Sequence, residues 1–329
     1  MKTPKSLRLK ALGILFTFFP GLAVCAAWAA DAYPNKPVRL IVPMTPGGGT
    51  DIIARMIAGK LSERIGKQVV VDNRGGGGGI IGSELAAKSA PDGYTLLVVT
   101  ATSTIQPSLR KLPYDPAKSF TPIAKLESGT LTLIVHPSVP ANSVKEFIAL
   151  GKRKPGELMM ASAGAGSIVH MAIERFRMMA GTDFEIVQFK SAGPGVIDLL
   201  GGHSHAMILS ITASLPHLRA GKLRALGTGG TKRSPILPEV PTIAEAGVPG
   251  YEATNWFGLV APAGMPAAVV RRLNKELQAI VASDEVNRVF LNDGAVADYL
   301  GPTEFDKFLK RERAQWAGVV KKANIKLEN

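Results

Sequence analysis

A run of glycines between an apolar strand and an amphipathic helix is the feature that most constrains this chain. Residues 38–42 form a short apolar stretch typical of a buried strand, and residues 46–49 read Pro-Gly-Gly-Gly before a helical pattern that begins near Asp51. Glycines at the turn let backbone N–H groups approach a ligand, and the start of a helix carries partial positive charge. The turn therefore predicts an α/β protein with an anion site here, with a purely structural strand–helix turn as the alternative.

The N-terminal residues have the pattern of an export signal. Basic residues precede an apolar stretch at 11–24, and small residues at 27–32 offer cleavage sites. We expect residues 1–29 to be a cleaved signal peptide and the mature protein to be periplasmic in a Gram-negative cell. The single cysteine, Cys25, lies in this leader, so we expect folding without disulfides and no thiol catalysis.

Size and charge limit the classes of protein that fit. The 329 residues exceed what one ordinary core accommodates, which favours two domains. The formal net charge is +13, but the positive residues are scattered singly along amphipathic helices such as the one expected at 145–154. This pattern indicates a solvated surface that attracts small anions. We therefore expect no nucleic-acid partner and no stable membrane insertion.

Strand-like and helical stretches alternate along the chain. Most strand candidates are continuous apolar runs, as expected for strands covered on both faces. The expected strands are residues 39–42, 69–71, 95–99, 132–135, 158–161, 185–189, 206–209, 223–226 and 256–260. The expected helices are residues 51–64, 80–90 and 168–179, one that begins at the Ser143/Glu146 capping box, and one that begins at Thr303. This order predicts an α/β architecture with largely parallel sheets.

The strand, small-residue turn and helix recur in the second half of the chain. The strand expected at 158–161 is followed by Ser-Ala-Gly-Ala-Gly-Ser at 162–167 and then by a helix. Open α/β sheets bind ligands at the carboxyl ends of their strands. Two such turns, one on each domain, predict that a ligand is held between the two domains. A third glycine run, at 75–79, is interpreted as partly pocket wall and partly loop.

Short motifs follow one another in a fixed order from about Tyr33 to Leu327. They are Pro43, Pro46-Gly47-Gly48-Gly49-Thr50-Asp51, Val71-Asp72-Asn73-Arg74, Ala90-Pro91-Asp92-Gly93-Tyr94-Thr95-Leu96-Leu97, Leu112-Pro113-Tyr114-Asp115-Pro116, Met160-Ala161-Ser162-Ala163-Gly164, Asp198-Leu199-Leu200-Gly201-Gly202, Gly221-Lys222-Leu223-Arg224-Ala225-Leu226, Leu237-Pro238-Glu239-Val240-Pro241-Thr242 and Trp256-Phe257-Gly258-Leu259. The set resembles the Bug family, the TctC-like substrate-binding receptors of tripartite tricarboxylate transporters. Chance is a poor explanation for so many motifs in order.

The resemblance implies a two-lobed type II periplasmic-binding-protein fold, in which each lobe is a mainly parallel sheet flanked by helices. Two crossover strands join the lobes, and we place the crossings near residues 131–136 and 253–262. Residues 30–131 and 254–329 are then expected to form a discontinuous first lobe, and residues 132–253 the second. The resemblance also implies a monomer that captures a small organic carboxylate and delivers it to inner-membrane permease subunits.

In this family, main-chain amides of two facing loops grip a ligand carboxylate, and the matching loops here are the two turns already identified. The expected ligand-binding residues are Thr45, Pro46, Gly47, Gly48, Gly49, Asp51, Thr100, Thr102, Ser103, Ser162, Ala163, Gly164, Ala165, Gly166, Ser167, His170, Lys190 and Ser210. We expect Asp51 mainly to cap the first helix and Lys190 mainly to reach solvent. For His170 a cleft position and a packing position are both open.

Departures from the family pattern bear on the ligand. Residues 207–210 read Met-Ile-Leu-Ser where relatives often carry Met-Phe-Asp-Asn, so a carboxylate that would pair with a ligand ammonium is missing. Gln106 stands where relatives usually have asparagine. These differences predict a ligand that is not an amino acid, such as a dicarboxylate, a tricarboxylate or an aromatic acid. Alternatively, the same binding protein presents its ligand to a membrane sensor kinase instead of a transporter.

The sequence does not favour an enzyme. It contains neither a Gly-x-Ser-x-Gly elbow nor the Gly-Lys-Ser/Thr of a phosphate-binding loop. His203 and His205 occupy alternate positions without a nearby cysteine or carboxylate cluster, so the sequence gives only weak support for a metal site. We therefore expect no catalytic residue, no metal and no cofactor.

Overall fold

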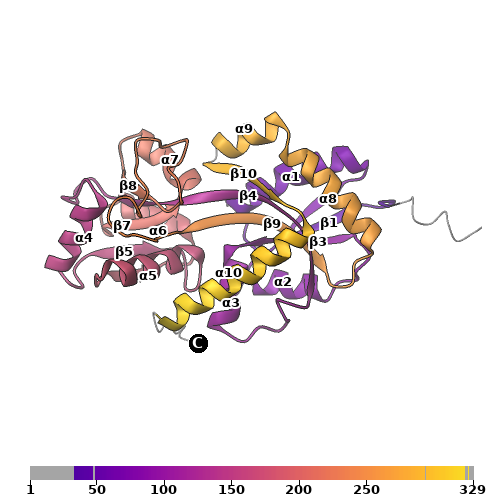
Figure 1. The fold of residues 1–329 in the computed structure, drawn as a ribbon, viewed down its shortest axis with the longest axis horizontal. Coiled ribbons are helices and arrows are strands. Elements are labelled where there is room, and N and C mark those ends of the chain that lie inside the picture. The colour runs from indigo at the N-terminus through magenta and orange to yellow at the C-terminus, as the bar shows by residue number, and fades with distance from the viewer. Residues whose placement is uncertain (1–32, 47–48, 293, 323–324, 326–329) are drawn as a thin grey trace, which may run out of the picture. The chain divides into compact units, whose positions relative to one another are not determined.

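Helices and strands alternate through the body of the protein, Pro34–Asn329 (Figure 1). The structure is a computed structural model, and it describes residues 33–46, 49–292, 294–322 and 325. The expected signal peptide at 1–29, with Cys25, lies outside the described residues, as do Gly47 and Gly48. Within the described part of the chain, no helix is both long and apolar enough to cross a bilayer.

The bounds of the elements follow the predicted alternation. The strands are β1 (Val38–Val42), β2 (Val69–Asn73), β3 (Thr95–Thr100), β4 (Phe120–Val135), β5 (Met159–Ser162), β6 (Glu185–Gln188), β7 (Ala206–Ser210), β8 (Arg224–Thr228), β9 (Thr254–Pro262) and β10 (Ala295–Leu300). The helices are α1 (Gly49–Ile65), α2 (Ile80–Ala87), α3 (Ala101–Leu109), α4 (Val144–Arg153), α5 (Ile168–Ala180), α6 (Ala192–Leu200), α7 (Ile211–Arg219), α8 (Ala267–Val281), α9 (Asp284–Asn292) and α10 (Pro302–Lys322).

The strands join in the order β2-β1-β3-β9-β4-β7-β5-β6, and β8 and β10 also pair with β4. Strands β2, β1 and β3 run parallel to one another, as do β6, β5 and β7. Strands β4 and β9 pair antiparallel with their neighbours. The predicted two-lobed α/β fold class is confirmed, with antiparallel pairs added where the long strands join the parallel ones. We call β1, β2, β3, β9 and β10 with their helices the first half, and β5 to β8 with theirs the second half.

Strand β4 belongs to both halves. From Phe120 to Thr130 it pairs with β9, and from Leu131 to Val135 it pairs with β7 and β8. Strand β9 begins at Thr254 and runs beside β4 (Figure 1). These two strands contain the segments predicted to cross between lobes, while the lobe boundaries at residues 131 and 253 stay a prediction.

The strand order places the two predicted turns at corresponding points. Strand β1 lies between β2 and β3, and β5 lies between β6 and β7, so in each half the next two strands of the chain lie on opposite sides of the central strand. Such switch points in open α/β sheets form crevices at the carboxyl ends of the strands. The segments that follow β1 and β5 are the two small-residue turns, and the fold therefore presents both at crevice positions.

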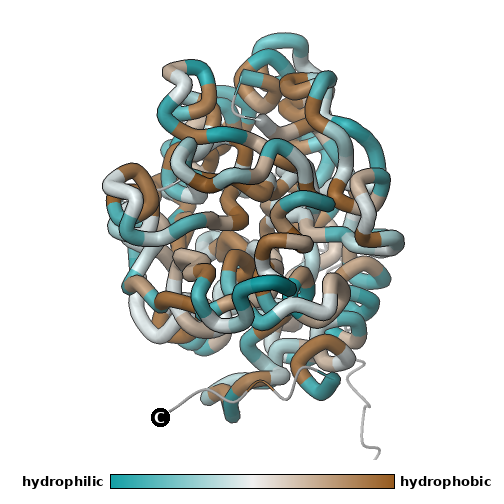
Figure 2. Tube along the Cα trace, turned by 90° about the vertical axis from the view of Figure 1, so that its left-hand side faces the viewer, coloured by the Kyte–Doolittle hydropathy of each residue, from teal (hydrophilic) through white to brown (hydrophobic). Residues whose placement is uncertain are grey.

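Each half contains its own aromatic cluster. In the second half, Phe147 stacks on Phe184 with ring centroids 4.9 Å apart, and Phe176 stacks on Phe184 at 6.0 Å. In the first half, Trp256 meets Phe305 edge to face at 5.8 Å. Hydrophobic segments gather toward the interior of the traced chain, and hydrophilic stretches lie mostly at its periphery (Figure 2). Burial of these rings stabilises both halves.

Two strand segments were not predicted from the sequence: the part of β4 before Leu131, and all of β10. The first includes Lys125 and Glu127, which break the apolar pattern although both side chains are buried. Lys125 pairs with Asp298 of β10 and lies over the ring of Phe308, 4.5 Å from its centroid. A buried charge that finds its partner 173 residues away leaves no local signal of a strand.

Candidate functional site

A cavity of about 550 Å³ lies between residues of the first half and residues of the second, and we call it the cleft. Its volume is in the range of small-molecule binding sites. The described residues that line it are Pro43, Met44, Thr45, Thr50, Gly75, Gly76, Gly77, Gly78, Gly79, Thr100, Thr102, Gln106, Ala163, Gly164, Ala165, Ser167, Ile168, Val169, Lys190, Ser191, Ala192 and Asn255. They follow the carboxyl ends of β1, β2, β3, β5 and β6, with Asn255 added from β9.

Five helices begin at this cleft: α1, α2, α3, α5 and α6. Residues at their starts line it, namely Thr50, Gly79, Thr100, Ser167 and Ser191. The first-turn N–H groups of a helix lack intrahelical partners and carry partial positive charge. Helices α2, α3 and α6 receive no side-chain cap. The cleft therefore presents a convergent set of backbone donors to its contents.

Hydrogen bonds within the loop fix the second-half turn. The Oγ of Ser167 accepts from the N–H of His170 at 3.2 Å and caps α5. The N–H of Gly166 donates to Nδ1 of His170 at 3.0 Å, and the N–H of Ser167 donates to the carbonyl of Gly164 at 3.1 Å. The N–H groups of Ile168 and Val169 lie in the first turn of α5, where a helix provides no intrahelical partner, and both residues line the cleft.

His170 positions this loop and does not line the cleft. Its side chain is buried, and Nε2 lies 3.6 Å from the carboxylate of Glu174. Because Nδ1 accepts a hydrogen bond from Gly166, the ring proton belongs on Nε2, facing Glu174. Of the two positions left open for His170 by the sequence, the structure shows the packing position.

Glycines form the first-half wall of the cleft. Gly76, Gly77, Gly78 and Gly79 all have positive φ, between 60° and 125°, a region that other residues rarely adopt. A Cβ on Gly78 would lie 2.5 Å from Nε2 of Gln106, so the side-chain amide packs directly on the glycine backbone. This run was interpreted as part wall and part loop, and it lies along the cleft.

The structure brings part of the predicted site together. The predicted residues that line the cleft are Thr45, Thr100, Thr102, Ala163, Gly164, Ala165, Ser167 and Lys190. The predicted residues that lie outside its lining are Pro46, Gly49, Asp51, Ser103, Ser162, Gly166, His170 and Ser210. Gly47 and Gly48 are not among the described residues. Ligand contact by any of these residues stays a prediction.

Several of the residues outside the lining hold the neighbouring backbone in place. The buried carboxylate of Asp51 accepts from Arg55 at 3.0 Å and from Asn73 at 2.9 Å, which ties α1 to β2. Ser103 donates its hydroxyl to the carbonyl of Thr100 at 2.6 Å. Ser210 caps α7. These side chains are engaged in the scaffold of the turns.

Sequence reasoning missed other residues of the cleft, above all Asn255. Asn255 is the second residue of β9 and reaches the cleft because β9 lies between β3 and β4. No local pattern marks such a residue, since its place depends on long-range strand pairing. Gln106 was noticed only as a departure from a family pattern, although it lines the cleft from α3. Lys190, by contrast, was among the predicted residues; it lines the cleft, and its side chain is exposed.

The cleft favours negative charge in its contents. Among the described lining residues there is no aspartate or glutamate, and Lys190 adds a cation. The described part of the chain also contains no group of three or more histidine, cysteine, aspartate or glutamate side chains arranged to hold a metal ion. Recognition therefore falls to backbone N–H groups, hydroxyls and side-chain amides.

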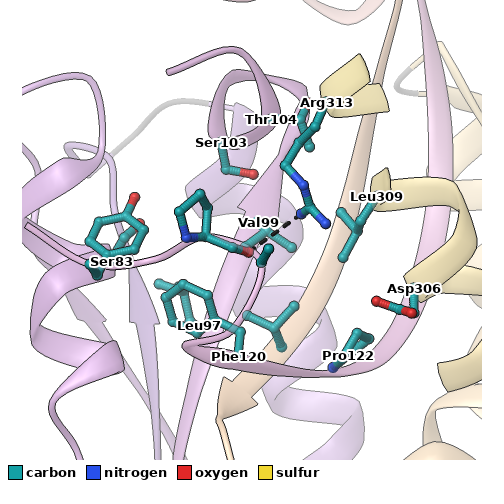
Figure 3. A pocket seen from close by; sticks show the side chains of 14 residues that line it. Ser83, Leu97, Val99, Ser103, Thr104, Phe120, Pro122, Asp306, Leu309 and Arg313 are labelled. Atoms are coloured by element: carbon teal, nitrogen blue, oxygen red, sulfur yellow. Dashed lines mark hydrogen bonds between the residues drawn. The ribbon is translucent and has the colours of Figure 1, made fainter. Parts of the chain in front are cut away.

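A second cavity, between β3, β4 and α10, has a volume of about 30 Å³ (Figure 3). Arg313 reaches into it and donates to the carbonyl of Pro116 at 3.4 Å. Burial lowers the pKa of the Arg313 guanidinium. A space of this size accommodates about one water molecule and no organic acid. The cleft is therefore the candidate binding site.

Comparison with known proteins identifies similar receptors. The family model described as the tripartite tricarboxylate transporter family receptor, TctC, matches residues 53–325. The chain is 36% identical to the protein BugT of Bordetella pertussis over 322 residues, which cover 97% of this chain and 99% of BugT.

Two solved structures are similar over nearly the whole body. The structure of Rpa4515 of R. palustris with adipate has a TM-score of 0.84 and 38% sequence identity, covering 89% of this chain and 99% of that one. The periplasmic binding protein BugD has a TM-score of 0.81 and 34% identity, covering 90% of this chain and all of BugD.

Proposed function

Because the chain belongs to the tripartite tricarboxylate transporter receptor family, we propose that it captures a small organic carboxylate in the cleft and delivers it to the permease of such a transporter. Rpa4515, which is 38% identical, has been solved with adipate, a dicarboxylate. The family consists of receptors, which agrees with a binding role. We infer that the leader directs export and that the mature receptor acts in the periplasm.

The strongest support for a carboxylate ligand comes from one feature of the cleft. Five helix N-termini meet at a cleft whose described lining contains no acidic side chain. Each N-terminus acts as roughly half a positive charge within its first turn. Charge-assisted hydrogen bonds from backbone N–H groups offset the cost of desolvating a carboxylate. The ligand then needs no basic side chain on either wall. A neutral ligand would gain little from this arrangement.

The charge of the cleft also argues against an amino acid. A ligand ammonium would be buried among helix N-termini and near Lys190, with no carboxylate from the described lining to pair with it. Burying an unpaired charge is strongly unfavourable. We therefore propose a dicarboxylate, a tricarboxylate or an aromatic acid without an ammonium group.

Contact with both halves gives a mechanism for signalling that the ligand is bound. The cleft takes residues from the ends of β1, β2 and β3 and from the ends of β5 and β6, and the strand order joins the two sets through β9 and β4. A carboxylate that contacts both walls stabilises the conformation in which they are closest. We propose that the permease recognises this closed form, and that the chain acts as a monomer.

Isothermal titration calorimetry on the purified protein tests the proposal. The acids are succinate, adipate, citrate, benzoate and nicotinate, with aspartate and glutamate as amino-acid comparisons. We expect micromolar binding of at least one of the first five and no comparable binding of the amino acids. Gly164→Val places a side chain on a lining residue with φ +100° and should abolish binding.

Gly156→Val is the matched control. Gly156 also has positive φ, +75°, but a Cβ there meets nothing within 4 Å, and it does not line the cleft. It should lose similar stability and keep the affinity. If none of the acids binds, or if Gly164→Val binds as the wild type does, the proposed function is wrong. Delivery to a transporter predicts that deleting the gene abolishes uptake of the bound acid by intact cells.

A further inference from the structure

Gln106 holds an unusual position in the wall of the cleft. Its side chain is only 2% exposed, yet neither Nε2 nor Oε1 has a hydrogen-bond partner among the described residues. Buried polar atoms in native proteins are almost always bonded, and an unbonded one is destabilising. Gln106 is one of the residues that line the cleft, and its two polar atoms are themselves almost fully covered. A rotation of the side chain would bring such a group to the cavity, where a ligand can satisfy it.

The glycine wall fixes where this amide lies. A Cβ on Gly78 would be 2.5 Å from Nε2, so the amide rests against bare backbone. Gln106 also lines a second, much smaller space of about 10 Å³, together with residues that include Gly78, Gly79, Ser83, Ser103 and Tyr114. A water molecule needs at least about 10–15 Å³. The amide therefore has more room for a partner on the side of the 550 Å³ cleft.

Asn255 supplies a second acceptor in the same cleft. Its Oδ1 is buried and has no hydrogen-bond partner among the described residues. Gln106 comes from α3 and Asn255 from β9, and both line the cleft. The two amide oxygens accept hydrogen bonds only, so their partner must carry a donor. A plain dicarboxylate, ionised at both ends, has no donor to offer.

The charge of the cleft restricts what that donor can be. Helix N-termini and Lys190 make the surroundings positive, and the described lining has no acidic residue, which excludes an ammonium group. A hydroxyl or a carboxamide provides a neutral donor. Each also provides an acceptor for Nε2 of Gln106.

We propose that Gln106, together with Asn255, determines specificity for a carboxylic acid that carries a hydroxyl or carboxamide group in addition to its carboxylate. The inference rests on the proposed carboxylate-binding function and narrows its substrate class. A site that hydrogen-bonds a ligand hydroxyl discriminates against the analogue that lacks it, because the protein groups are then left buried and unpaired.

Calorimetric titration with matched ligand pairs provides the test. The pairs are succinate with malate, succinate with succinamate, glutarate with 2-hydroxyglutarate, and benzoate with 3-hydroxybenzoate. For the wild type, we expect the hydroxylated or amidated member of at least one pair to bind about tenfold or more tightly than its plain partner. Which members gain affinity distinguishes a hydroxyl from a carboxamide ligand.

Substitution identifies the residues responsible. Gln106→Met keeps the approximate size and removes both polar atoms, so the preference within the pair should fall below about threefold, mainly because the hydroxylated or amidated acid loses affinity. Asn255→Leu should reduce the preference in the same direction. Thr132→Val is the control: the Oγ1 of Thr132 is also buried without a described partner, but Thr132 does not line the cleft, so this variant should keep the full preference. Circular dichroism verifies that each variant is folded.

The outcomes separate this inference from the proposed function. If plain acids bind as tightly as their hydroxylated and amidated partners in the wild type, or if Gln106→Met keeps the preference, the specificity role is wrong and carboxylate binding stands. If no acid in any pair binds, the specificity role is wrong, and the proposed function is wrong as well if adipate, citrate and nicotinate also fail to bind.

Discussion

The two walls of the cleft reach a similar position in the fold by different means. In the second-half wall, residues 163–169, the backbone is held by its own hydrogen bonds: Ser167 caps α5 and His170 accepts from Gly166. In the first-half wall, residues 75–79 with α3, the four glycines from Gly76 to Gly79 have positive φ, the starts of α2 and α3 lack side-chain caps, and the amide of Gln106 has no hydrogen-bond partner among the described residues. The side chains of Ser167 and His170 have their partners within the second-half wall, whereas the amide of Gln106 in the first-half wall still lacks one.

This difference suggests a division of roles. A wall whose loop is fixed in advance binds a common group, the carboxylate, at little ordering cost. A wall with unsatisfied polar atoms gains most from a ligand that supplies the missing partners, and so it discriminates between acids. The four predictions below test this division, from the largest expected effect to the smallest.

Gly78→Val should have the largest effect. The valine side chain would meet Nε2 of Gln106 at 2.5 Å, and φ +70° disfavours any residue with a Cβ. We expect at least about a hundredfold loss of affinity for the tightest-binding acid, which corresponds to about 2.7 kcal/mol. Calorimetry and a thermal melt on the same sample separate binding from stability.

The control is Gly156→Val, at a glycine with φ +75° and open space around its Cβ position. This variant should lose as much stability and bind normally. Equal affinity in the two variants would contradict the role of the glycine wall.

His170→Leu tests whether the second-half wall is fixed in advance. It removes the acceptor of the Gly166 N–H and leaves that donor buried, so we expect about a tenfold loss of affinity, or about 1.4 kcal/mol. His170→Asn can place an oxygen near the position of Nδ1 and should recover part of the loss. The loss should be similar for plain and hydroxylated acids, because this wall binds the shared carboxylate. A loss confined to one class of acid would contradict the division of roles.

The stability of the free protein distinguishes the walls in another way. Gln106→Met removes two buried, unbonded polar atoms and should raise the free energy of unfolding by about 1 kcal/mol, measured by urea denaturation without ligand. Ser162→Ala is the matched control, beside the second-half wall. The Oγ of Ser162 is also buried without a partner among the described residues, but Ser162 does not line the cleft. It should change stability less and leave the affinity alone. A destabilised Gln106→Met would show that the amide is satisfied in the free protein.

Lys190→Met should have the smallest effect. Lys190 lines the cleft from the second half, but it is exposed, and exposed charges are screened by salt. We expect less than about a threefold loss of affinity at 0.15 M salt, with a slightly larger loss at low salt. A tenfold loss would mean that a cationic side chain, and not the backbone, holds the carboxylate.

The sequence predicted those parts of the site that depend on local chemistry. The second small-residue turn was predictable because Gly164, Gly166 and their neighbours interrupt a strand–helix pattern within a few residues. The capping box at Ser143 and Glu146 was visible for the same reason, and the structure confirms it: the N–H of Glu146 donates to Ser143 at 3.2 Å. The signal and its cause lie within a few residues of each other.

The parts that were missed depend on contacts far along the chain. Asn255 enters the cleft only because β9 inserts between β3 and β4. The first part of β4 was missed because Lys125 is buried against Asp298 of a distant strand. His170 illustrates the intermediate case, since its position one turn into α5 was clear, but its acceptor role toward Gly166 depends on the shape of the loop.

The most direct test of the central claim is a crystal structure of the protein with a bound dicarboxylate or hydroxydicarboxylate. We predict that one ligand carboxylate accepts hydrogen bonds from the backbone N–H groups at the start of α5, at about 2.7–3.1 Å, and that the far end of the ligand lies against Gly78 and Gln106. A carboxylate bound through surface lysines or arginines, with the starts of α2, α3 and α5 facing only water, would contradict it.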